Sequence, residues 1–94
     1  MHTGPHRDHL FHVTLPRRRG AGWGWTVTSA RGMRLHGPWS TREQAANARR
    51  RLLWRWQHAA RARGGWMWCQ TAVRWVVTLP ADQPTDGLPF EHAP

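Results

Sequence analysis

Two stretches near the start of the chain alternate apolar and polar side chains, which is the pattern of strands with one buried face. They cover residues 9–15 and 23–28. The segment between them, 17–22, begins with three arginines and ends in glycines that favour a turn. We therefore expect a β-hairpin with a basic tip. Its apolar positions are Phe11, Val13, Leu15, Trp23, Trp25 and Val27.

Two further segments have the composition of strands. Residues 33–36 place Met33 and Leu35 on one side and Arg34 and His36 on the other. The segment 66–79 is rich in Trp, Val and Thr, which favour strands, and it predicts either one long strand or a bent pair of strands.

A helix is expected over residues 41–63. Ser40 and Glu43 have the spacing of a capping box, in which two side chains satisfy backbone N–H groups at the helix start. At about 100° per residue an apolar stripe follows one side of the helix, and two glycines at 64–65 end it. The stripe comprises Ala45, Ala48, Leu52, Trp56 and Ala59.

These elements follow the order β-β-β-α-β. We expect an α+β fold of two layers, an antiparallel sheet with one long helix packed on one face. The predicted domain covers residues 9–80, between a flexible arm at 1–8 and an acidic, proline-containing, disordered tail at 81–94. Its expected core combines the apolar hairpin positions with Met33, Leu35, Leu52, Trp56, Val73, Trp75 and Val77.

Positive charge dominates the predicted domain. All 14 basic residues are arginines that precede Pro80, and only Asp8 and Glu43 oppose them there. The whole chain of 94 residues carries a formal net charge of +9. Such a chain attracts polyanions, so an acidic partner is expected.

Other features of the composition bear on location. The single cysteine, Cys69, excludes an intrachain disulfide and favours a reducing compartment. The first 20 residues contain no apolar run of a secretory signal, and the longest apolar runs are too short to cross a bilayer. We therefore expect a cytoplasmic protein with no membrane partner.

Three surfaces are candidates for contact with an acidic partner. The helix side opposite the apolar stripe carries arginines, which hold phosphates, around Trp54, whose indole can stack on a base. The hairpin tip, with Arg17, Arg18 and Arg19, suits a nucleic-acid backbone. The polar sheet face is the third. A merely solvated surface is the alternative for all three, but on the helix it does not predict Trp54 or the near absence of acidic residues. The helix residues are Arg50, Arg51, Trp54, Arg55, His58 and Arg61, and the sheet residues are His12, Thr14, Thr26, Thr28, Arg34, His36 and Arg74.

The sequence favours binding over catalysis. It holds no paired carboxylates, and Cys69 lies in an apolar strand phase that predicts a packed thiol rather than a nucleophile. His6, His9 and His12 recur every third residue, but on a strand His9 and His12 point to opposite faces, so no metal site is expected. No cofactor is expected either, because the glycines at 20–24 precede a strand rather than a helix.

Residues 23–50 contain a tryptophan hairpin, a short strand and the helix start STREQAANAR. This segment resembles the sheet-type DNA-binding domains that include the arm-binding domains of phage integrases, and also small bacterial domains with a hairpin–helix–strand order. The first resemblance implies DNA contact through the sheet, by Arg17, Arg19, Thr26 and Arg34. The long last strand departs from that group, in which the helix follows three strands and usually ends the domain.

Together these features predict a small, non-enzymatic nucleic-acid-binding protein. DNA is favoured over RNA, and a bacterial or phage accessory or regulatory role is expected. The alternative is a protein-interaction module or inhibitor that docks on an acidic partner protein through the basic helix and exposed Trp66 and Trp68. A homodimer formed through the edge of the last strand is compatible with both hypotheses.

Overall fold

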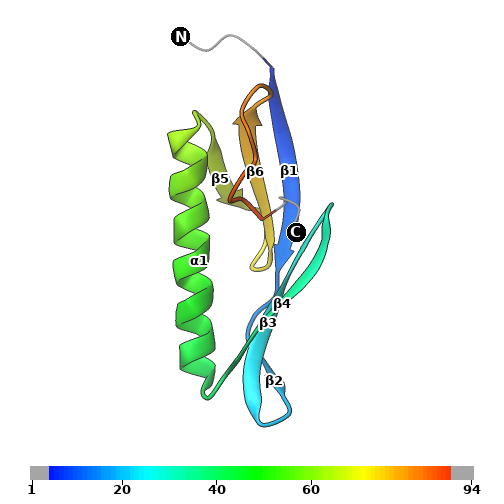
Figure 1. The fold of residues 1–94 in the computed structure, drawn as a ribbon, viewed down its shortest axis with the longest axis vertical. Coiled ribbons are helices and arrows are strands. Elements are labelled where there is room, and N and C mark those ends of the chain that lie inside the picture. The colour runs from blue at the N-terminus through cyan, green and yellow to red at the C-terminus, as the bar shows by residue number, and fades with distance from the viewer. Residues whose placement is uncertain (1–4, 90–94) are drawn as a thin grey trace.

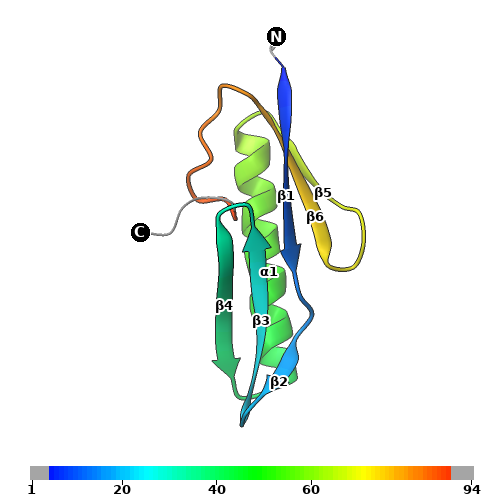
Figure 2. The same ribbon diagram turned by 90° about the vertical axis from the view of Figure 1, so that its right-hand side faces the viewer.

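The computed structural model describes residues 5–89 and confirms an α+β fold with one helix packed on an antiparallel sheet. Figure 1 shows α1 along one face of the sheet, and Figure 2 shows the opposite face toward the viewer, with α1 behind it. The elements are β1 (His6–Val13), β2 (Arg17–Arg19), β3 (Gly22–Ser29), β4 (Gly32–Trp39), α1 (Arg42–Ala62), β5 (Trp66–Cys69) and β6 (Arg74–Pro80).

The predicted order of elements omitted two strands. The three arginines expected at a hairpin tip form β2, which pairs with β3 from Arg17↔Gly24 to Arg19↔Gly22, and the turn follows at 20–21. The segment 66–79 is the bent pair of strands, β5 and β6, which pair with each other. The sheet runs from β4 through β3 and β1 to β6 and β5, and β2 continues the line of β1 along β3 (Figure 2).

The capping box of α1 lies one residue beyond the predicted one. The Thr41 hydroxyl accepts a hydrogen bond from the Gln44 backbone N–H at 3.1 Å, and Gln44 Oε1 accepts one from the Thr41 backbone N–H at 3.3 Å. Ser40 and Glu43 were the wrong pair, because their neighbours supply the same chemistry in the next register. After the helix, Gly64 adopts a φ of +79°, a left-handed conformation that glycine reaches without a steric cost.

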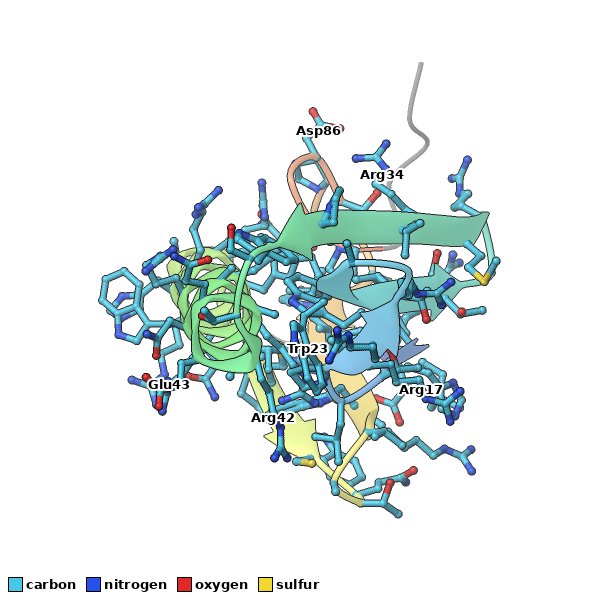
Figure 3. The ribbon with its side chains drawn as sticks, turned by 90° about the horizontal axis from the view of Figure 1, so that it is seen from below. Arg17, Trp23, Arg34, Arg42, Glu43 and Asp86 are labelled. Atoms are coloured by element: carbon cyan, nitrogen blue, oxygen red, sulfur yellow. The ribbon has the colours of Figure 1, made fainter. Side chains whose placement is uncertain are left out.

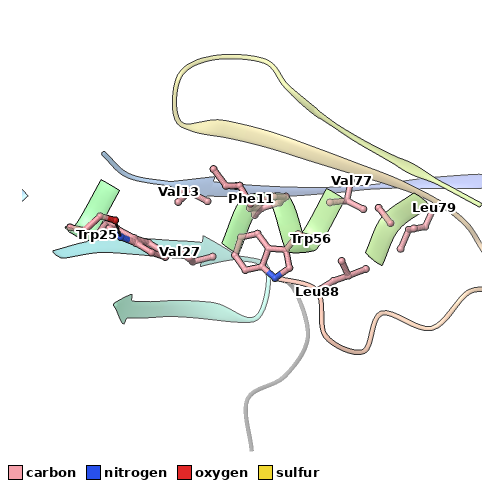
Figure 4. Close-up of a cluster of buried hydrophobic side chains, with 11 residues drawn as sticks. Phe11, Val13, Trp25, Val27, Trp56, Val77, Leu79 and Leu88 are labelled. Atoms are coloured by element: carbon pink, nitrogen blue, oxygen red, sulfur yellow. Dashed lines mark hydrogen bonds between the residues drawn. The ribbon is translucent and has the colours of Figure 1, made fainter. Parts of the chain in front are cut away.

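The core lies between α1 and the helix-facing side of the sheet (Figure 4). The Trp25 indole is buried and donates a hydrogen bond from Nε1 to the Ala45 carbonyl of α1 at 2.8 Å. Phe11 and Trp56 meet edge to face, with ring centroids 5.5 Å apart. Predicted core residues that are buried are Phe11, Val13, Trp25, Val27, Trp56 and Val77, and those that the prediction missed include Ala45, Leu53, Ala60, Val76, Leu79 and Leu88.

Strand β4 is turned over relative to the prediction. Its pairing with β3 shifts from Trp23↔Trp39 to Trp25↔His36, so two residues of β4 oppose one residue of β3 in a β-bulge. From the turn at 30–31 onward, Met33 pairs with Thr28 and Leu35 with Thr26, which places both apolar side chains on the side of the sheet away from α1. The side chains of Met33 and Leu35 are therefore 71% and 54% exposed, and their assignment to the core was wrong. Leu15, which follows the end of β1, is also exposed rather than buried.

Part of the predicted tail is folded. Residues 81–89 turn back over the molecule, and Leu88 is only 4% exposed in the core cluster, beside Trp56 (Figure 4). The Arg63 guanidinium donates a hydrogen bond to the Asp86 carbonyl, which holds the segment against the end of α1. Disorder was thus the wrong prediction for 81–89, and 90–94 lies outside the described residues.

The predicted N-terminal arm is also shorter than expected. His6 to Asp8 pair with Pro80 to Thr78 as the first residues of β1, because the backbone of β6 offers partners along its whole length. Residues 1–4 lie outside the described part. Within residues 5–89, no helix combines the length and apolar composition that crossing a bilayer requires.

Leu88→Ala is expected to lower the free energy of unfolding by about 2–3 kcal/mol, because truncating a buried leucine leaves a cavity. Leu35→Ala, at an exposed leucine, is the control and is expected to change it by less than about 0.5 kcal/mol. Urea unfolding followed by tryptophan fluorescence measures both variants. Equal stability of the two would show that Leu88 does not contribute to the core.

Candidate nucleic-acid interface

The nine residues predicted to bind nucleic acid are distributed over separate surfaces. We call the side of α1 turned away from the sheet the far face, and the side of the sheet turned away from α1 the open face. The far face carries Arg50, Arg51, Trp54 and Arg61, the open face carries Arg17 and Arg19, and a cleft between β4 and α1 holds Arg34 and Arg55. Arg18 lies beside Trp23.

The far face follows from helical periodicity. Because Leu53 and Trp56 contact the sheet, Trp54 points away from it, and its side chain is 60% exposed. Residues three and four positions away are its neighbours on the helix surface. The ring of His58 lies with its centroid 3.9 Å from that of Trp54, and a shallow hollow of about 290 Å³ is lined by Asn47, Arg50, Arg51 and Trp54.

Positive charge on the far face has little opposition. Glu43 is the only acidic residue of α1 and lies in its first turn, about two turns before Arg50 (Figure 3). Arg50 donates a hydrogen bond to Asn47 Oδ1 at 2.5 Å, a contact that orients the guanidinium without neutralising it. The far face therefore presents oriented cations around an exposed aromatic ring.

The open face is more apolar than predicted. Its tryptophans, Trp66 and Trp68, are exposed there as expected, on the same side of the sheet as Leu10. Met33 and Leu35 join them because β4 is turned over, and they replace Arg34 and His36, which were wrongly assigned to this face. Of the polar residues predicted for the open face, His12, Thr14, Thr26, Thr28 and Arg74 do lie there.

Strand β2 divides its arginines between the two faces of the sheet. Arg17 and Arg19 are on the open face, and Figure 3 shows Arg17 on the side away from α1. Arg19 Cδ and Leu35 Cδ1 lie 3.5 and 3.7 Å from the position that a Cβ atom on Gly24 would occupy, so the missing side chain leaves room for both. The Arg18 guanidinium carbon lies 5.9 Å from the Trp23 ring centroid, a cation–π contact.

The cleft between β4 and α1 brings Arg34 and Arg55 together. It has a volume of about 360 Å³ and is closed at one side by residues 87–89. Arg31 and His36 also line it; the sequence prediction missed Arg31 as a site residue and placed His36 on the open face. Burial, and then the charge of Arg34, lowers the pKa of His36. The signal that could have revealed this arrangement is the Gly-Pro pair at 37–38, since such breakers inside a strand pattern often mark a bulge.

Arg49 is a structural arginine that no sequence pattern separated from its neighbours. It lies on the sheet-facing side of α1, where Nε donates to the Thr14 carbonyl at 3.0 Å. Its Nη2 donates to the Val13 and Ala72 carbonyls at 3.0 and 3.1 Å. Burial lowers the pKa of the guanidinium. Arg49 therefore satisfies carbonyl groups at the ends of strands and is not available to a partner.

The histidines of β1 alternate between the two sides of the sheet. His6 contacts Trp66, with ring centroids 5.6 Å apart, whereas His9 pairs with Val77 of the core side. Within residues 5–89, no three His, Cys, Asp or Glu side chains come together as a metal site would require. Cys69 is exposed at the end of β5, not packed in the core as predicted, and its thiol donates to the Thr71 carbonyl.

Comparison with known proteins gives no assignment: no family model matches the chain, and neither a curated protein nor a solved structure is significantly similar to it. The resemblance of residues 23–50 to sheet-type DNA-binding domains therefore stays a prediction from the sequence. The functional assignment depends on the geometry and charge of the surfaces described above.

Arg49→Met is expected to lower the free energy of unfolding by about 2–3 kcal/mol, because carbonyl groups that accept from a charged donor lose it. Arg51→Met removes an equal charge from the far face and is expected to change stability by less than about 0.5 kcal/mol. Thermal or urea unfolding monitored by circular dichroism compares the two. A loss of stability in Arg51→Met as large as in Arg49→Met would contradict the structural role of Arg49.

Proposed function

We propose that this protein binds nucleic acid, with DNA favoured over RNA, through the far face of α1 and without catalysing a reaction. The observation that supports this best is the exposed Trp54 among Arg50, Arg51 and Arg61, on a helix whose only acidic residue is Glu43. A helix face that serves solubility alone has no need of an exposed tryptophan at its centre. Stacking on a base would bury that ring, and guanidinium groups on either side would hold the phosphates.

The dimensions of the far face suit a polynucleotide backbone. Arg50 and Arg61 are separated by about 16 Å along the helix axis, at about 1.5 Å per residue. One strand of duplex DNA places a phosphate about every 3.4 Å along its axis, so this length corresponds to about five phosphates. The proposal includes a cytoplasmic, accessory or regulatory role in a bacterium or phage, in line with the net charge of +9 and the single cysteine.

The open face favours a second candidate, a protein-interaction module. Seven large hydrophobic residues are exposed within residues 5–89, and five of them are on this face: Leu10, Met33, Leu35, Trp66 and Trp68. An apolar surface of this kind is typical of contact with another protein. Arg17, Arg19 and Arg74 on the same face would suit an acidic partner protein or inhibitor target, and a homodimer is the symmetric version of the same contact.

The DNA-binding proposal predicts steep weakening by salt. Fluorescence anisotropy of labelled duplex and single-stranded DNA is expected to give a log–log slope of about −0.9 for each phosphate neutralised on duplex. The double variant Arg50→Glu/Arg51→Glu is expected to weaken binding more than about tenfold and to flatten this slope, because charge-assisted contacts are lost. Its matched control, Arg17→Glu/Arg19→Glu, makes the same change of charge on the open face and is expected to have a much smaller effect.

Trp54→Ala in the same titration separates stacking from charge. It is expected to weaken binding to single-stranded DNA by about 1–3 kcal/mol without altering the salt slope. Absence of binding by the unmodified chain at low salt would reject the nucleic-acid proposal. A larger loss for Arg17→Glu/Arg19→Glu than for Arg50→Glu/Arg51→Glu would place the contact on the open face instead.

The second candidate predicts that nuclease treatment leaves a stoichiometric protein partner bound in affinity purification. Trp66→Ala/Trp68→Ala is expected to abolish this capture, because buried tryptophans at interface centres carry much of the binding energy. The same double variant is expected to leave the DNA titration unchanged. If capture survives the loss of both tryptophans, the open face is not the docking surface.

A further inference from the structure

The cleft between β4, α1 and residues 87–89 has a cationic rim and an apolar floor. The floor is formed by buried side chains, Val27, Trp56 and Leu88. The rim carries the exposed residues Arg31, Arg34 and Arg55. His36 also lines the cleft and is partly buried. These two kinds of surface face one volume of about 360 Å³, which lies toward the small end of ligand pockets, about 300–1,000 Å³.

Three different parts of the fold create this arrangement. The pairing of β4 with β3 places Arg34 and His36 opposite Val27 and Trp25, on the side toward α1. Helical periodicity places Arg55 beside Leu52 and Trp56 on the β4 side of α1, and the folded segment after β6 adds Leu88. Parallel stacking on Trp25, with ring centroids 4.4 Å apart, fixes the orientation of the His36 imidazole.

Within residues 5–89, no carboxylate lines the cleft to offset these cations. Asp86 is next to the lining residue Gly87, and Figure 3 shows it with Arg34 at the edge of the molecule that β4 forms. The backbone carbonyl of Asp86 accepts a hydrogen bond from the Arg63 guanidinium. Like charges around one volume repel, and an anion placed between them would relieve that repulsion.

We propose that the cleft binds a small organic anion in which a phosphate or carboxylate is joined to an aromatic or other apolar group. The guanidinium groups of Arg34 and Arg55 hold the anionic end, for which their forked donors are suited. The apolar group lies against Trp56 and Leu88. This inference is independent of nucleic-acid binding, because Arg34 and Leu88 are not part of the far face.

His36 provides a signature of the bound anion. Burial and the charge of Arg34 both lower the pKa of its imidazole in the empty cleft. The charged groups that line the cleft with it are Arg34 on its own strand, Arg31 in the turn before β4 and Arg55 on α1, and all three are cationic. A bound anion offsets their charge, so the pKa of His36 rises on binding, and an NMR titration of the imidazole signals detects the change.

The test uses the full chain and three probes: phenyl phosphate, inorganic phosphate and phenol. Phenyl phosphate is expected to shift the His36 and Trp56 side-chain NMR signals saturably, and the other two probes are expected to bind at least about tenfold more weakly, since each lacks one of the two groups. Arg34→Gln is expected to weaken phenyl phosphate binding about tenfold or more, and Arg55→Gln to do the same independently. Arg51→Gln, on the far face, is the matched control and is expected to retain the affinity.

Two results would overturn the proposal. One is the absence of a saturable shift of the His36 signals with phenyl phosphate. Another is unchanged affinity in both Arg34→Gln and Arg55→Gln. DNA titration of Arg34→Gln keeps the two proposals apart, since loss of phenyl phosphate binding with normal DNA binding concerns the cleft alone.

Discussion

A single helix can cover only one face of a six-stranded sheet, and this constraint shapes the whole molecule. On the covered face, α1 is fixed by the hydrogen bond from Trp25 to Ala45, by the packing of Trp56 on Phe11 and by the guanidinium of Arg49. These contacts determine which side of α1 is turned outward, and therefore where Trp54 lies. The open face has no helix to cover it in the described part of the chain, and its tryptophans and aliphatic residues stay in contact with solvent.

The arginines serve two purposes that net charge does not distinguish. Arg49 and Arg63 donate to backbone carbonyls, and Arg18 lies against the ring of Trp23, so each contributes to the fold itself. In a small domain with a limited core, guanidinium groups can substitute for apolar contacts, since the long stem packs while the fork satisfies carbonyl groups. The charge available to a partner is correspondingly smaller than the formal total, and it is divided among the far face, the open face and the β4 cleft.

Local periodicity predicted more of this structure than any other feature of the sequence. The helix and the strands of the hairpin were found because their patterns depend on neighbouring residues, and the far face followed directly from the helix. The orientation of β4 could not be found in this way, because it depends on which residue of β3 lies opposite each of its own residues. The burial of Leu88 depends in turn on a hollow between β4 and α1 that no single segment encodes, so the cleft was missed entirely.

The bulge in β4 also has an evolutionary consequence. If every residue of β4 paired one to one, the register that begins at Trp23↔Trp39 would continue unbroken and place Leu35 opposite Val27. Loss of the codon for one of the two residues opposite Gly24 would remove the bulge and still leave Arg34 opposite Val27, so the charged lining of the cleft would survive the deletion. Descendants of one ancestral gene could in this way differ in length at the bulge and keep the same residues at the cleft.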